Sequence, residues 1–243
     1  MTFNDVERLP VVDSTNAEAL RRAQAGERGP LWILADVQTA GRGRSGRSWT
    51  SEAGNLHASL LFSLALPQPM AYQLALVAGV AVFDALQSAL YPAPAGLRLK
   101  WPNDILIEDA KTGGILIESS MAGGILVAVI GIGLNVATAP VLPDRPTTYL
   151  AAYGRAPEPH LLLESIADHM ANWLAIWDQG RGFAAVREAW LNRALPIGER
   201  LSINTGSDHV LGTFAGLDPE GALLLESGGS VRRFTFGDVT LAR

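Results

Sequence analysis

The sequence predicts an α+β protein with two domains. Residues 1–195 form the larger domain, with a mixed sheet flanked by helices, and residues 196–243 form a small SH3-like β-barrel. Short β-type runs follow one another in the larger domain without the regular crossover helices of a parallel sheet. After Pro196-Ile197-Gly198, short apolar runs alternate with Gly, Asp, Asn and Ser turns, which is typical of a small barrel.

The composition is that of a folded globular protein, with 48% hydrophobic and 18% charged residues in 243. The absence of cysteine excludes disulfides and a catalytic thiol and favours a cytoplasmic location. The acidic N-terminus does not resemble a secretory signal, and the most apolar stretch, Met121–Leu134, is too short to span a membrane. A net charge of −5 argues against a broad DNA-binding surface, because lysine and arginine supply most affinity for phosphates.

The first predicted element is a capped helix. Asp13-Ser14-Thr15-Asn16 supplies the N-cap, small apolar and polar residues alternate from Ala17 to Ala25, and Gly26 ends the helix. The β-type runs Leu31–Val37 and Leu56–Leu66 then predict two strands.

A long core helix is predicted between Met70 and Leu90, where apolar residues recur with helical period. Three short β-rich runs follow, and the tight links between them indicate an antiparallel or mixed sheet. These runs are Leu97–Trp101, Ile115–Glu118 and Ile125–Ile132.

Helical patterns return at Pro159–Trp177 and Gly182–Leu195, before the proposed domain boundary. Five short strands are predicted beyond it: Arg200–Ile203, Val210–Phe214, Leu223–Glu226, Val231–Phe236 and Val239–Leu241.

The most informative segment is Gly41-Arg42-Gly43-Arg44-Ser45-Gly46-Arg47-Ser48-Trp49, whose glycines and arginines are suited to binding an anion. Its glycines also match the dinucleotide-binding pattern G-x-G-x-x-G. Two features argue against that interpretation, since no helix start follows Gly46 and no acidic residue ends a second parallel strand about 20 residues later. Taken alone, the segment could also be a basic surface turn without function.

Two further segments place polar groups at strand ends. In Lys100-Trp101-Pro102-Asn103-Asp104, the Asp104 carboxylate could hold a magnesium ion or a ribose, or could simply cap a turn. Lys111 follows seven residues later and could be an ordinary surface lysine. In Gly131-Ile132-Gly133-Leu134-Asn135, the glycines could relieve packing and Asn135 could turn the chain.

In combination, these segments resemble those of biotin protein ligases, in the same order and at similar spacing. The resemblance includes Asp13–Asn16, Gln38 through Trp49, Lys100–Asp104, Lys111 with Gly114, and Gly131–Asn135, and it extends to the Gly237-Asp238-Val239 segment. It implies a catalytic domain of the class II synthetase and biotin ligase type, with a C-terminal SH3-like barrel. It also implies an ATP-dependent enzyme that forms biotinyl-AMP and transfers biotin to a lysine of a carboxylase carrier domain.

The resemblance assigns roles residue by residue. The expected catalytic residues are Lys111, Arg44 and Arg42. The expected biotin-binding residues are Ser14, Thr15, Asn16, Gln38, Gly41, Arg42, Gly43, Arg44, Lys111 and Gly114. The expected ATP and adenylate contacts are Arg44, Arg47, Trp49, Asn103, Asp104, Lys111 and Asn135, with Asp104 as a candidate Mg²⁺ ligand.

Two other functions fit the resemblance less well. A lipoate ligase or octanoyl transferase would share the fold, but the arginine-glycine segment and Lys100–Asp104 favour biotin, and no cysteine nucleophile is present. A catalytically inactive biotin or nucleotide sensor would not need Lys111. Some relatives carry an N-terminal DNA-binding domain, and the position of the Asp13–Asn16 segment predicts a ligase without repressor function. Homodimers are common among relatives, but no segment here identifies an interface.

Overall fold

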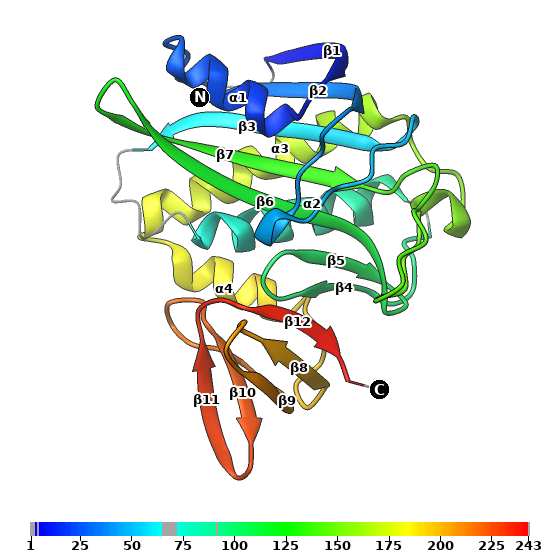
Figure 1. The fold of residues 1–243 in the computed structure, drawn as a ribbon, viewed down its shortest axis with the longest axis vertical. Helices are drawn as coiled ribbons and strands as arrows, with labels where there is room; N and C mark the ends of the chain where they lie inside the picture. Colours follow the sequence, from blue (N-terminus) through cyan, green and yellow to red (C-terminus); the bar gives the residue numbers. More distant parts are fainter. Residues whose placement is uncertain (1–2, 4, 65–71, 91, 243) are drawn as a thin grey trace.

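The computed structural model describes residues 3, 5–64, 72–90 and 92–242. Two sheets organise these residues (Figure 1): one of seven strands in the order β1-β2-β3-β7-β6-β5-β4 and one of five in the order β11-β10-β9-β8-β12. The strands of the first sheet are β1 Val6–Val12, β2 Leu31–Gln38, β3 Leu56–Leu64, β4 Leu97–Lys100, β5 Asp104–Ile107, β6 Ala110–Ala122 and β7 Ile125–Leu134.

The helices and the second sheet complete the described elements. The α-helices are α1 Thr15–Gln24, α2 Gln73–Ala89, α3 Pro159–Trp177 and α4 Phe183–Leu191, and the short 3-10 helices are η1 Arg44–Gly46, η3 Leu150–Tyr153 and η4 Asp178–Gly180. The strands of the second sheet are β8 Arg200–Asn204, β9 His209–Leu217, β10 Leu223–Ser227, β11 Ser230–Phe234 and β12 Asp238–Leu241.

The larger sheet is mixed, because β1 pairs with β2 in parallel and every other pairing in it is antiparallel. The predicted fold class is therefore confirmed. The sequence analysis missed β1 and β5. β1 is an edge strand that contains Pro10 and several exposed residues, and β5 has only four residues directly after a turn.

The two faces of the larger sheet carry different partners. In β7, Leu126, Ala128, Ile130 and Ile132 belong to the main core with α2 and α3, whereas Val127 and Val129 pack with Ala19 and Ala23 of α1. Side chains alternate across a strand, so Gly131 and Gly133 share the α1 face with Val127 and Val129. Figure 1 shows α1 in front of this sheet and α2 and α3 behind it.

The helices agree with the predicted ranges, with one shorter element. α3 has the predicted bounds, while the predicted start of the α2 helix at Met70 and the predicted strand end at Leu66 lie outside the described residues. α4 ends at Leu191 rather than Leu195. The next residues pair with β4 instead, because Leu99 N–H donates to Arg193 O and Leu195 N–H donates to Leu99 O, at 2.8 and 3.0 Å.

All five strands predicted for the C-terminal segment are present and form an antiparallel sheet. This sheet lies below the β4 edge of the larger sheet in Figure 1. Trp101 Nε1, in the turn after β4, donates to Gly221 O at 3.1 Å, and Arg187 of α4 donates to the carbonyls of Leu217 and Asp218. Buried and partly buried hydrogen bonds therefore join the C-terminal sheet to the rest of the chain. The boundary after residue 195 stays a prediction. Within the described residues, no helix is long and apolar enough to cross a membrane.

Candidate active site

A cavity of about 300 Å³ opens on the α1 face of the larger sheet, beside the C-terminal sheet. Its walls come from the start of α1, residues 42–50, the turn at residues 101–104, the start of β6, the end of β7, residues 140–147, and β12. The predicted motifs, which are far apart in the sequence, therefore meet around one space. Of the predicted site residues only Gly41 does not line it.

The floor of the cavity is made of glycines. Gly114 of β6 pairs with Gly133 of β7, and Gly131 lies two residues earlier on the same face. A Cβ on Gly133 would lie 2.5 Å from the Trp49 ring, and one on Gly131 would overlap the Asn16 side chain. The glycines therefore leave room for Asn16 and Trp49, which cover the sheet at this end. A larger residue at either position would collide with one of these two side chains.

One end of the cavity is polar. Ser14 caps α1, since its Oγ accepts a bond from Ala17 N–H at 3.5 Å. Gln38 Oε1 accepts from the Thr15 backbone N–H at 2.8 Å and from Thr15 Oγ1 at 3.1 Å. Because the Gln38 carbonyl is used in this way, its amide NH₂ group is the end available to a ligand.

The other end of the cavity holds a buried ion cluster. Asp104 accepts from Lys111 Nζ at 2.6 Å and pairs with Lys100 Nζ at 2.8 Å. Burial alone would raise the pKa of Asp104, but the two ammonium groups outweigh that effect and hold its pKa well below the usual range. Lys111 also lies over the Trp49 ring, 5.7 Å from its centroid. These are the only two lysines in the sequence.

The prediction of Mg²⁺ on Asp104 does not fit this geometry. Both carboxylate oxygens are engaged by lysine ammonium groups, and a divalent cation there would add a third positive centre. No group of three His, Asp or Glu side chains suited to a metal ion occurs in the part of the chain that the structure describes. We therefore assign Asp104 to the lysines and not to a metal.

The glycine-arginine segment forms a tight hairpin. Arg42 and Ser48 form an antiparallel β-bridge through their backbones, and Gly43 N–H donates to Arg47 O at 2.7 Å. The 3-10 helix η1 turns the chain between these two pairs. Gly46 has a φ of 72°, a backbone conformation that glycine adopts without strain. A hairpin next to antiparallel strands is not the strand-to-helix turn of a dinucleotide-binding fold, so that alternative is excluded.

The arginines of the hairpin contact β6, the turn between β4 and β5, and the start of β12, where Arg44 Nη2 also donates to Gly237 O at 3.4 Å. Arg42 pairs with Glu118 of β6 at 3.4 Å, and Arg44 donates to Asn103 Oδ1 at 3.1 Å. Arg47 pairs with Asp238 of β12. Gly41 lies behind Trp49 and Gln38, where a Cβ would come within 2.6 Å of Trp49 O, so it supports the cavity wall without facing the cavity.

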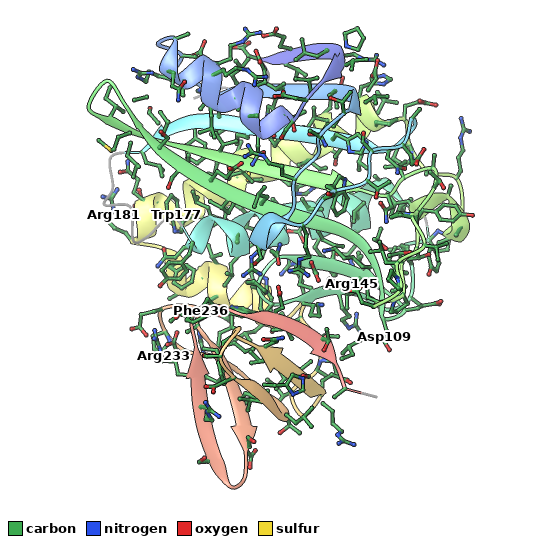
Figure 2. All side chains as sticks on the ribbon, in the orientation of Figure 1. Asp109, Arg145, Trp177, Arg181, Arg233 and Phe236 are labelled. Atoms are coloured by element: carbon green, nitrogen blue, oxygen red, sulfur yellow. The ribbon has the colours of Figure 1, made fainter. Side chains whose placement is uncertain are left out.

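The sequence analysis missed the wall formed by residues 140–147. Arg145 lines the cavity and pairs with Asp144 at 2.5 Å, and Figure 2 shows it near the end of β5 and the start of β6. Two backbone hydrogen bonds hold this segment against Lys111. The Lys111 backbone N–H donates to Pro146 O, and the Lys111 backbone carbonyl accepts from Thr148 N–H, both at 2.9 Å. Asn135 Nδ2 donates to Thr148 O at 3.1 Å, so Asn135 helps to fix the same segment.

His57 lies buried on β3, on the face that carries the cavity. Burial lowers its pKa, and a contact with the backbone of Glu52 offsets this only in part.

An unfolded chain would therefore bind a proton at His57 as the pH falls below about 6.5, while the folded chain binds it only at lower pH. We expect the free energy of unfolding to decrease between pH 7.5 and 5.5 in urea denaturation. His57→Gln should reduce this pH dependence and the exposed-site control His160→Gln should not; equal slopes in both variants would contradict the assignment.

Two protein-family models match this chain. The model for the "Biotin/lipoate A/B protein ligase family" matches residues 9–135, which is more than half of the chain. The chain belongs to the biotin/lipoate A/B protein ligase family. The model for the "Biotin protein ligase C terminal domain" matches residues 197–241, the segment that forms the second sheet.

Individual members of the family are similar over nearly the whole chain. The Paracoccus denitrificans biotin--[acetyl-CoA-carboxylase] ligase is 44% identical over 89% of this chain and 92% of its own length. The solved biotin protein ligase of Aquifex aeolicus, in complex with biotin and ATP, superposes with a TM-score of 0.81 at 26% identity over 99% of both chains. The Leishmania major enzyme in complex with biotinyl-5-AMP gives a TM-score of 0.67 at 29% identity, over 99% of both chains.

Proposed function

We propose that this chain is an ATP-dependent biotin protein ligase, which forms biotinyl-5′-AMP and transfers biotin to a lysine of a biotin carboxyl carrier domain. The observation that carries the proposal is the cavity itself, which places a polar end, a glycine floor and a lysine-arginine end in line. The names and ligands of the similar ligases support the same function.

The polar end suits the ureido ring of biotin. Ser14, Thr15 and Gln38 offer hydroxyl and amide groups to the ring, and a partly dry site makes such hydrogen bonds selective. The apolar thioether ring and the aliphatic tail of biotin would lie against the glycine floor. In this orientation the carboxylate of biotin extends toward Lys111, and we assign Asn16, Gly43 and Gly114 to the same binding surface.

The cationic end suits the first reaction. An oxygen of the biotin carboxylate attacks the α-phosphorus of ATP, the bond from that phosphorus to the bridging oxygen breaks, and pyrophosphate leaves. The reaction brings two anions together, so preorganised positive charge stabilises its transition state. Lys111, Arg42, Arg44 and Arg47 supply this charge, Trp49, Asn103 and Asn135 contact the nucleotide, and Asp104 orients Lys111.

The second reaction uses the activated carbonyl. The neutral amine of the carrier lysine attacks the biotinyl carbonyl carbon, the bond to the AMP oxygen breaks, AMP leaves and the amine loses a proton to solvent. This step requires mainly the positioning of the two reactants.

We further propose that the chain acts in the cytoplasm and does not bind operator DNA. The carrier domain would dock at the open side of the cavity. A homodimer is compatible with these proposals.

The direct test is ATP–pyrophosphate exchange in the presence of Mg²⁺, with biotin, with lipoate and without an acid. Exchange with biotin only is the expected result, because the polar end matches a ureido ring and not a dithiolane ring. Exchange with lipoate would assign the chain to the lipoate branch of its family, and no exchange with any acid would indicate a sensor.

A further inference from the structure

Glu118 contacts two walls of the cavity without lining it. It lies on β6, on the same face as Gly114, and its side chain is 25% exposed. One oxygen, Oε2, accepts a hydrogen bond from Asn16 Nδ2 at 2.7 Å and lies 3.4 Å from Arg42 Nη2. A single carboxylate oxygen thus joins the start of α1 to the glycine-arginine hairpin.

The contact with Asn16 determines how its amide is oriented. An ionised carboxylate only accepts hydrogen bonds, so the NH₂ end of Asn16 must face Glu118. Ser59 Oγ donates to Asn16 Oδ1 at 2.5 Å, which fixes the opposite end in the same sense. Asn16 is buried, and a reversed amide would place its oxygen against the carboxylate. Glu118 therefore holds Asn16, and with it the neighbouring Thr15, in one arrangement.

The contact with Arg42 is weaker and of a different kind. The Arg42 side chain is 46% exposed, so solvent screens much of its attraction to Glu118. The pair nevertheless ties the first arginine of the hairpin to β6 of the larger sheet, whereas Arg47 ties the hairpin to β12 of the C-terminal sheet. Loss of the negative charge at position 118 would free this side of the hairpin while the Asp238 contact remains.

We propose that Glu118 is a positioning residue that couples the polar end of the cavity to the placement of the glycine-arginine hairpin. The hydrogen bond that its carboxylate oxygen accepts from Asn16 orders Asn16 and Thr15, and its negative charge holds Arg42. The inference rests on the proposed function only in naming biotin as the ligand whose affinity should change.

Two substitutions separate the two roles. Glu118→Ala removes both contacts, and Glu118→Gln keeps an oxygen for Asn16 but removes the charge that Arg42 meets. We expect biotin affinity, measured by calorimetry, to fall about tenfold in Glu118→Ala, the effect of losing a hydrogen bond to a charged group, and to change by less than about threefold in Glu118→Gln. In ATP–pyrophosphate exchange the first variant should raise the KM for biotin by a larger factor than it lowers kcat, because Asn16 loses its partner outright and Arg42 loses only one contact.

Hydrogen exchange of residues 41–49, measured with and without biotin, tests the coupling. Both variants should exchange faster there than the unsubstituted chain, while the exposed-site control Glu164→Ala should not. Unchanged biotin affinity in Glu118→Ala, or unchanged hairpin exchange in Glu118→Gln, would overturn the proposal. If the unsubstituted chain bound no biotin, the proposed function would fail, and the hairpin exchange without biotin would still decide the role of Glu118. Glu118→Gln, which is nearly isosteric, covers the case in which Glu118→Ala does not fold.

Discussion

Lys111→Ala is expected to reduce ATP–pyrophosphate exchange by about 100- to 1,000-fold, the usual cost of removing one preorganised group that stabilises developing charge. Lys111 belongs to the cationic end of the cavity and its Nζ lies next to Gly114 of the glycine floor, where the carboxylate and the α-phosphate would meet. The two lysines of the sequence are the residues that pair with Asp104, and a lysine presents a compact ammonium group where an arginine would present a larger planar one.

The fold should survive this substitution, because Asp104 keeps its pair with Lys100 at 2.8 Å and is not left as an isolated buried charge. Thermal denaturation of the variant should therefore resemble that of the unsubstituted chain. Asp104→Ala is the contrasting variant, since it would leave two lysines without their shared partner and should destabilise the protein. Exchange by Lys111→Ala within threefold of the unsubstituted rate would remove Lys111 from the mechanism.

Gly133→Ala should weaken both biotin and ATP binding by about 10- to 100-fold, even though it adds a single methyl group. The new Cβ would lie 2.5 Å from the Trp49 ring, whereas carbon atoms in contact are about 3.5–4.0 Å apart. Trp49 would have to move, and with it the end of the hairpin that carries Arg42, Arg44 and Arg47. Titration calorimetry with each ligand measures the effect.

The cause can be isolated with Trp49→Ala, alone and combined with Gly133→Ala. If the clash with the indole is responsible, the double variant should bind the ligands no more weakly than Trp49→Ala alone, because the added methyl group then has space. Additive losses in the double variant would show that Gly133 acts through something other than Trp49.

The local features of this molecule follow from the sequence alone. The Ser14 cap, the bounds of α3 and the five C-terminal strands depend on neighbouring residues, through capping, turn residues and side-chain period. The same local motifs, taken together, supported the resemblance to biotin protein ligases, and nearly all the residues assigned from it line one cavity.

The partners of those residues were decided only by the tertiary structure. Glu118 meets Arg42 across 76 positions, and Asp238 meets Arg47 across 191, because strand order and register place β6 and β12 beside the hairpin. No local pattern reports such contacts. The same limit explains the magnesium assignment, since a carboxylate at a strand end fits a metal until the fold places two lysines on its oxygens. Sequence neighbours thus determined which chemistry was available, and packing between distant segments decided how each charge is used.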